Sequence, residues 1–180
     1  MDCSNCGKPG TIAIPYENKS LCDDCFCRSF EKRVLNTLRG HLPSNGRIGF
    51  DVSTLGGRVA FHVIEPLAVK ARNKCLESEK GVDLFIVGDT LDDEAISTVK
   101  IVIEGKLEKE KSKLVKPLAR CLESEVKAYA RIRGIESPSQ KKASRFDTIL
   151  REELDLVEEK HLSTKFALFN SKRYLVPLFE

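Results

Sequence analysis

Four cysteines near the start of the chain have the types and spacing of a metal site. Cys3 and Cys6 form one Cys-x-x-Cys pair, and Cys22 and Cys25 form a second. Each pair places two thiolates on one side of a tight turn, and two such turns complete a tetrahedral shell around zinc. Because thiolates fill all four positions, we predict a structural Zn²⁺. Disulfides would need an oxidising compartment, and an iron–sulfur cluster is the other alternative for four thiolates.

A second candidate for chemistry is the segment "DVSTLGGRVAF", residues 51–61. It follows an apolar run, precedes a helical pattern and holds a serine and two adjacent glycines. A loop in that place can present backbone N–H groups to a phosphate at a helix N-terminus. Ser53, Gly56 and Gly57 are therefore candidate nucleotide-binding residues.

Two adjacent carboxylates follow the next apolar run. In "GDTLDDEA" we expect Asp92 and Asp93 at the carboxyl end of a strand, in the first turn of a helix. Ligands of open α/β sheets bind at that edge, and carboxylates there could hold a magnesium nucleotide. Aspartates in a first turn also stabilise the helix dipole. The residues alone leave both interpretations open.

Basic residues are concentrated in the second half of the chain, although the net charge is only +3. Between Lys106 and Arg145 they outnumber acidic residues by about two to one. Such a band suits a polyanion such as RNA, and a solvated lysine-rich surface is the alternative. The candidate RNA contacts are Lys106, Lys109, Lys111, Lys113 and Lys116.

Hydrophobic periodicity predicts the elements that position these residues. A first helix should run from Phe26 to Leu38 and end before Gly40. Strands are predicted over 47–52 and 83–88, and their spacing fits a parallel strand–helix–strand crossover. The helix between them is expected from Arg58 towards Glu79, kinked or split by Pro66.

Further helices are predicted beyond the second strand. One should carry Asp92 and Asp93 and end at Gly105, and another should run from about Glu123 to Arg133. A last helix is expected over about 146–160, and "RYLVPLF" (173–179) reads as a closing strand or an extended tail. The buried stripe expected for the last helix consists of Ile149, Leu150, Leu154 and Val157.

Length and composition fit one ordinary domain with a small appendage. We predict a zinc ribbon over 1–28, a connecting helix and turn over 29–45, and an α/β domain over 46–180. No apolar run approaches the length of a membrane span, and "MDCSNC" lacks the layout of a signal peptide. We therefore expect a soluble, cytoplasmic protein.

Taken in order, these motifs resemble the PP-loop tRNA 2-thiouridine synthetases, ATP-dependent enzymes that replace a uridine oxygen with sulfur. The resemblance is carried by the double cysteine knuckle, "FCRSFEKRVLNTL", the serine–glycine loop, "LDDEA", "KPLARCLESEVKAYARIRGI" and "EEKHLSTKFALFNS". It implies a zinc ribbon joined by a helix to a truncated PP-loop domain, of the adenine nucleotide alpha hydrolase-like class, with a parallel sheet.

The chain also departs from this family at its chemical positions. The family loop reads Ser-Gly-Gly-Lys-Asp-Ser, whereas this chain has Ser-Thr-Leu-Gly-Gly-Arg from Ser53 onward. Leu55 brings a side chain where the backbone must approach a phosphate closely, so we predict a degenerate loop. The family's cysteines for sulfur chemistry have no counterparts here. Cys27 is interpreted as a spare thiol, and Cys75 and Cys121 as packed or surface cysteines.

Three hypotheses follow from the resemblance and its departures. The first is a non-catalytic partner subunit of tRNA 2-thiolation, which assists a catalytic PP-loop enzyme in a hetero-oligomer and contacts tRNA. A sheet of only two parallel strands would leave an edge or face for that partner, or for a second copy, to cover. The second is an ATP-dependent tRNA 2-thiouridine synthetase with reduced motifs, which would need ATP and Mg²⁺. The third is a zinc-ribbon module that binds another RNA or protein.

Overall fold

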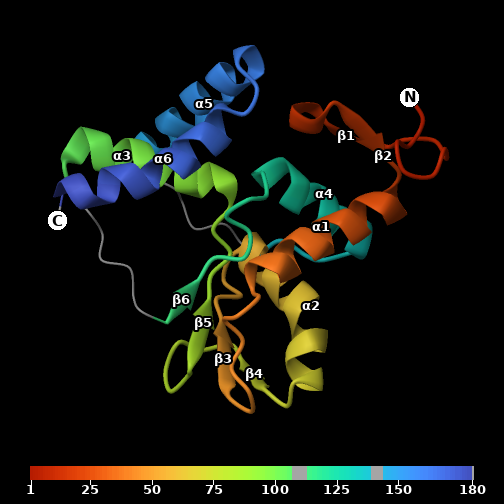
Figure 1. The fold of residues 1–180 in the computed structure, drawn as a ribbon, viewed down its shortest axis with the longest axis vertical. Coiled ribbons are helices and arrows are strands. Elements are labelled where there is room, and N and C mark those ends of the chain that lie inside the picture. Colours follow the sequence, from red (N-terminus) through yellow and green to blue (C-terminus); the bar gives the residue numbers. More distant parts are fainter. Residues whose placement is uncertain (107–112, 139–143, 180) are drawn as a thin grey trace.

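The computed structural model describes residues 1–106, 113–138 and 144–179 and shows an α/β fold (Figure 1). The N-terminal segment is a short antiparallel hairpin that carries the cysteine pairs. Its strands β1 (Ile12–Ile14) and β2 (Lys19–Leu21) are joined by the 3-10 turn η1 (Pro15–Glu17). Asn18 closes that turn in the left-handed conformation, with a φ of 51°. We call this hairpin and its cysteines the N-terminal ribbon.

The first helix follows the ribbon directly. Helix α1 (Asp23–Thr37) buries Phe26, Phe30 and Val34 completely, which confirms the predicted apolar stripe. The Phe30 ring stacks on Tyr129 of α4 (Glu123–Arg133), with ring centroids 4.6 Å apart. The helix that leaves the ribbon therefore forms part of the main hydrophobic core.

The sheet is larger than the sequence predicted. It has four parallel strands in the order β4-β3-β5-β6, so the expectation of only two strands was wrong. The predicted pair, β3 and β5, lies at its centre, and two very short strands flank it. The bounds are Arg47–Phe50 for β3, Lys74–Leu76 for β4, Leu84–Ile86 for β5 and Leu114–Val115 for β6.

The helix between the two central strands is shorter than predicted. Helix α2 (Leu55–Lys70) continues through Pro66 instead of splitting there, and it ends well before Glu79. Arg72 then adopts a φ of 61°, and the Asn73 side chain accepts a hydrogen bond from the Gly46 amide at 2.7 Å. This reversal turns the chain into β4, so the predicted end of the helix is a strand.

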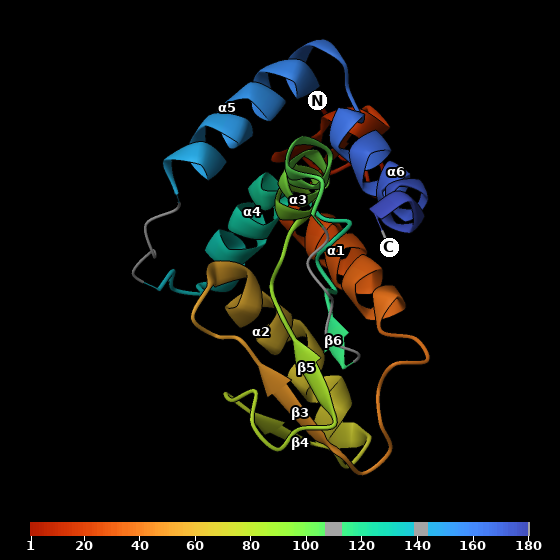
Figure 2. The ribbon, with the colours of Figure 1, turned by 90° about the vertical axis from the view of Figure 1, so that its left-hand side faces the viewer.

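The remaining helices form two groups. Helices α1, α2 and α4 pack together beside the sheet. The other group, α3, α5 and α6, lies away from the four-stranded sheet, with α3 between α5 and α6 (Figure 2). The bounds of this group are Leu91–Glu104 for α3, Arg145–Lys160 for α5 and Thr164–Phe179 for α6. None of the helices in the described part of the chain is long and apolar enough to cross a membrane.

Two predictions for the C-terminal part were wrong. The segment 173–179 belongs to helix α6 and is neither a strand nor an extended tail. Helix α5 contains no buried residue, and Ile149 and Val157 are 46% and 41% exposed. The physical reason is position, because α5 lies on the outside of α3 and α6 while α6 packs along α3.

The predicted ends of two other helices are confirmed. Gly105 ends α3 and Gly134 ends α4, both in the left-handed conformation with φ values of 62° and 66°. Glycine adopts this conformation with little strain, which explains why these positions stop their helices.

Candidate functional site

The four predicted metal ligands come together in the N-terminal ribbon. The Sγ atoms of Cys3, Cys6, Cys22 and Cys25 all lie within 4.8 Å of one another. In the first knuckle the amides of Cys6 and Gly7 donate to the Cys3 carbonyl at 3.3 and 2.9 Å. In the second, Cys22 is the N-cap of α1 and Cys25 lies in its first turn.

The spacing of these thiols fits one metal ion. Cys6 Sγ and Cys22 Sγ are 3.6 Å apart. Four thiolates at the usual Zn–S distance in a tetrahedron would be about 3.8 Å apart. A four-iron cluster separates its ligand sulfurs further, because four irons lie between them. The four thiols perturb one another: a backbone hydrogen bond from Cys22 lowers the pKa of the Cys3 thiol to about 6, whereas the side-chain hydrogen bond with Cys6 raises that of Cys25 to about 12.

Two amides and one hydroxyl of the serine–glycine loop are hydrogen-bonded within the loop. The amide and the hydroxyl of Ser53 both donate to the Asp51 carboxylate, at 3.1 and 2.5 Å. Thr54 is the N-cap of α2, and its hydroxyl accepts the Gly57 amide at 3.0 Å. A carboxylate and a hydroxyl therefore accept hydrogen bonds from the groups that a phosphate-binding loop would offer to its anion.

The two glycines of the loop have a packing role. A Cβ at Gly56 would overlap the carbonyl oxygen of Gly88, just beyond β5. A Cβ at Gly57 would overlap the carbonyl oxygen of Asp51, and both glycines are buried. Glycine is thus needed at both positions for the close approach of the α2 N-terminus to the neighbouring backbone.

Asp92 and Asp93 lie in the first turn of α3, as predicted, and both are paired with cations. Asp92 is 5% exposed and accepts from Lys165 Nζ at 2.5 Å and from the Glu123 amide at 2.7 Å. Asp93 accepts from the Thr90 amide in a capping box and from Arg151 at 2.7 Å. The first-turn position favours the helix dipole, and side chains of α5 and α6 supply the positive charge.

No local pattern in the sequence indicated Lys165 and Arg151 as partners of these carboxylates. Lys165 lies 73 residues after Asp92, is only 4% exposed and also pairs with Asp155. Arg151 bridges Asp93 and Glu123. The only available signal was the resemblance of "EEKHLSTK" to a family motif, which gave no partner for its lysine.

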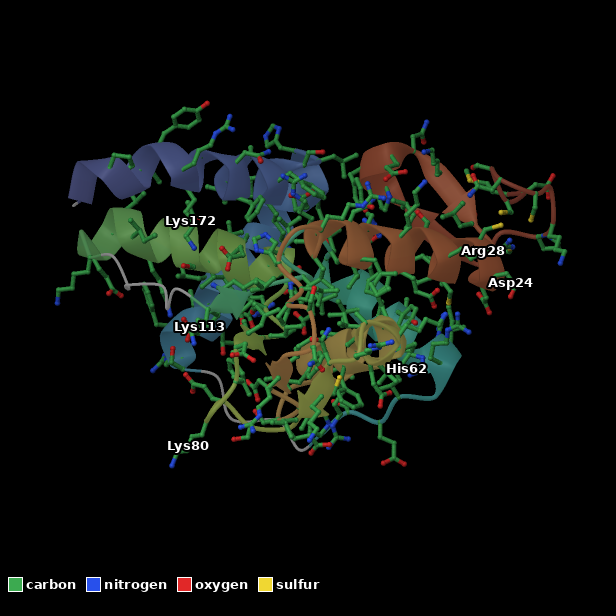
Figure 3. The ribbon with its side chains drawn as sticks, turned by 60° about the horizontal axis from the view of Figure 1, so that its bottom comes forward. Asp24, Arg28, His62, Lys80, Lys113 and Lys172 are labelled. Carbon is green, nitrogen blue, oxygen red and sulfur yellow. The ribbon has the colours of Figure 1, made fainter. Side chains whose placement is uncertain are left out.

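A second ion network links α3 to β6 and α6. Glu94 accepts from Lys116 Nζ at 2.6 Å and from Lys172 Nζ at 2.9 Å, and Lys172 lies between α6 and α3 (Figure 3). Burial alone would raise the pKa of Glu94, but the hydrogen bonds from the two lysines lower it overall. Lys116 also pairs with Asp89 at 3.1 Å. Burial would lower the pKa of Lys116, but its hydrogen bonds and charge interactions with Glu94 and Asp89 raise it overall.

The structure divides the candidate RNA contacts into three groups. Lys106 and Lys113 are exposed, and Figure 3 labels Lys113. Lys116 is half-buried in the network with Glu94. Lys109 and Lys111 lie outside the described residues.

The remaining cysteines lie outside the metal cluster. Cys27 and Cys121 are 2% and 1% exposed, and Cys75 is half-buried on β4. Burial raises the pKa of all three thiols, for Cys121 to about 12. In the described parts of the chain, no second group of three or more potential metal ligands accompanies the four-cysteine cluster.

The N-terminal ribbon is similar in sequence to known proteins. Residues 2–27 match the family model described as "2-thiouridine synthetase TtuA, N-terminal LIM domain". A curated relative, the tRNA 2-thiolation protein NcsA of Haloferax volcanii, is 44% identical over 39 residues. That match covers 22% of this chain and 12% of the length of the relative.

The fold as a whole matches a solved structure. It is that of the U34-tRNA thiolase NcsA from Methanococcus maripaludis with its [4Fe-4S] cluster, with a TM-score of 0.79 and 18% sequence identity. The match covers all of this chain and 88% of that one. Fold and ribbon therefore define an α/β protein with a parallel sheet and an N-terminal four-cysteine metal site. The ribbon is thus similar in sequence to tRNA 2-thiolation proteins, and the chain as a whole shares the fold of one of them, in agreement with the resemblance that the sequence motifs carry.

Proposed function

We propose that the chain is a non-catalytic partner subunit in tRNA 2-thiolation, which assists a catalytic PP-loop enzyme and contacts tRNA. The TtuA-type N-terminal domain and the NcsA-like fold support the pathway. The absence of catalysis rests on the chemistry of the loop and of the carboxylates near it.

One observation carries this proposal: at the start of α2, the Ser53 amide and hydroxyl and the Gly57 amide already donate to acceptors of the loop itself. A bound pyrophosphate would have to displace the Asp51 carboxylate from Ser53 and the Thr54 hydroxyl from Gly57. The Asp51 carboxylate would also repel it, because like charges at short range are unfavourable.

The carboxylates near the loop support the same conclusion. A nucleotide-bound Mg²⁺ needs oxygen ligands that are free to coordinate it. Asp92 and Asp93 are already neutralised by Lys165 and Arg151. The side chains of Lys165 and Arg151 therefore occupy the positions beside these carboxylates that a nucleotide-bound Mg²⁺ would need.

The ribbon is proposed to hold a structural Zn²⁺. Four cysteines would bind the ion and leave no position for water or substrate. The ion would fix the fold of the ribbon, in which β1 and β2 are only three residues long.

Surface features support a protein partner and a tRNA contact. Helix α5 exposes the apolar side chains of Phe146, Ile149 and Val157, each more than 40% exposed. Exposed apolar patches of this kind are typical of protein interfaces. Lys106 and Lys113 are exposed and available to phosphates of the tRNA backbone.

The proposal is tested by titration with ATP and Mg²⁺ and by a tRNA thiolation assay. We expect no heat of binding at millimolar ATP, and no thiolation by the isolated chain with a sulfur donor. Addition of the chain to a catalytic PP-loop enzyme from the same cell should raise its thiolation rate. ATP-dependent thiolation by the chain alone would establish the enzyme hypothesis instead.

A further inference from the structure

A solvent-open pocket of about 490 Å³ lies where the ribbon meets α1 and α6. The ribbon contributes Tyr16 and Glu17, and α1 contributes Arg33 and Asn36. Arg120 precedes α4, and Phe166 lies in the first turn of α6. The volume falls in the range of small-ligand sites, about 300–1,000 Å³. The pocket is separate from the loop at the start of α2, which contributes none of these residues.

One wall of the pocket is aromatic. The rings of Tyr16 and Phe166 are in contact, with centroids 5.0 Å apart and planes inclined by 56°. Both side chains are half-buried, so part of each ring remains open to solvent. Half-exposed aromatic faces are the surfaces on which nucleobases stack in complexes with single-stranded RNA.

The aromatic wall is held in place by a buried charge. Tyr16 Oη donates to Glu125 Oε1 at 2.9 Å, and Arg33 pairs with the same carboxylate and donates to Tyr16 Oη. The Glu125 side chain is only 4% exposed. Because burial and these hydrogen bonds fix the Glu125 carboxylate, the Tyr16 ring is oriented before any ligand arrives.

The charge of the pocket favours an anionic ligand. Arg33 is paired with Glu125, and Glu17 is paired with Lys19 at 2.9 Å, so the charge that remains at the pocket is that of Arg120. Arg120 is exposed, and its guanidinium lies 5.8 Å over the Phe169 ring. No carboxylate of the described residues is within ion-pair distance of Arg120. This guanidinium is therefore available for a phosphate.

We propose that this pocket binds one unpaired nucleotide of an RNA chain. The base stacks on Phe166 and Tyr16, its polar edge meets the exposed amide of Asn36, and the adjoining phosphate pairs with Arg120. The assignment rests on the proposed function, since it names the part of tRNA that the chain holds. It places that contact at the ribbon, away from the lysine-rich segment.

The test uses the full chain and a fluorescein-labelled hexamer of uridine, with binding followed by anisotropy at low salt. Arg120→Glu should weaken binding by about tenfold, the scale of one charge-assisted hydrogen bond. Arg131→Glu is the matched control, because Arg131 is an exposed arginine of α4 outside the pocket, and it should change binding by less than about threefold. Unlabelled uridine monophosphate should compete far more weakly than the hexamer.

Photocrosslinking locates the base independently of charge. A hexamer with one central 4-thiouridine should crosslink to the peptide of Tyr16 or Phe166, as read by mass spectrometry. Equal losses in the two arginine variants, or crosslinks confined to other peptides, would overturn the assignment. Monophosphate that competes as well as the hexamer would overturn the RNA chain as ligand.

The two proposals can fail separately. Tenfold weaker binding of Arg120→Glu, with no effect of the chain on tRNA thiolation, would remove the proposed function and keep the pocket. Stimulation of thiolation that survives Arg120→Glu unchanged, together with crosslinks elsewhere, would remove the pocket and keep the function.

Discussion

Replacing Lys165 with methionine should destabilise the protein strongly. The Lys165 side chain is 5% exposed, and its ammonium group neutralises Asp92, whose side chain is 7% exposed. Methionine retains most of the volume, so the variant removes the charge and leaves Asp92 as a buried carboxylate. Loss of one partner of a buried pair costs about 3–5 kcal/mol.

The lower end of that range applies here. Asp92 keeps the hydrogen bond from the Glu123 amide at 2.7 Å, and Asp155, the second partner of Lys165, is 55% exposed and can be solvated. We therefore expect a loss of about 3 kcal/mol in the free energy of unfolding. For a chain of 180 residues this corresponds to a fall in Tm of about 6–12 °C.

Urea unfolding followed by circular dichroism measures the loss. Lys127→Met is the matched control, because Lys127 forms an exposed pair with Glu123 and should change stability by less than about 1 kcal/mol. In a double-mutant cycle, Asp92→Asn should recover part of the loss caused by Lys165→Met. Equal effects of the two lysine variants, or strict additivity in the cycle, would refute the buried pair as the source of the stability.

Three further predictions concern other parts of the molecule. Gly57→Ala should destabilise the protein by about 3 kcal/mol in urea unfolding, because the added Cβ meets the Asp51 carbonyl oxygen. Glu94 has a lowered pKa in the folded state, so the unfolded state binds more protons in acid, and the stability that Glu94 contributes should be lost as the pH falls below about 4.5. Glu94→Gln should flatten that part of the pH–stability curve, and an unchanged slope would contradict the assignment. Elemental analysis should find about one zinc per chain, which Cys6→Ser abolishes and Cys75→Ser leaves intact.

Local signals were sufficient to predict the main elements. The apolar stripe of α1, the central strands β3 and β5, and the glycine stops of α3 and α4 follow from periodicity and glycine conformation. Strand β6 was missed because it is only two residues long, too short for a pattern. Strand β4 is as short as β5, but its sequence Lys-Cys-Leu lacks the continuous apolar run that marks β5. The exposure of α5 was mispredicted because its stripe of Ile149 and Val157 says nothing about which neighbour is present.

The candidate site residues that could be predicted are likewise those whose signal is local in the sequence. The four cysteines were found because their ligand spacing is local within each pair. The side chains that pair with Asp92 and Asp93 come from 73 and 58 residues further along the chain, where a single sequence gives no record of proximity. The prediction of a degenerate loop rested on Leu55 and remains a prediction, whereas the acceptor role of Asp51 is visible only in the geometry.

Glu125 couples the motion of two regions that are far apart in the sequence, the N-terminal ribbon and α4. Its carboxylate caps the start of α4 by accepting the Leu122 amide at 2.9 Å, and the same group receives Tyr16 of the ribbon and Arg33 of α1. A displacement of the N-terminal ribbon would therefore also displace the first turn of α4, because both contact the same carboxylate. We therefore expect the N-terminal ribbon, α1 and α4 to move together as one rigid unit when the protein binds a partner.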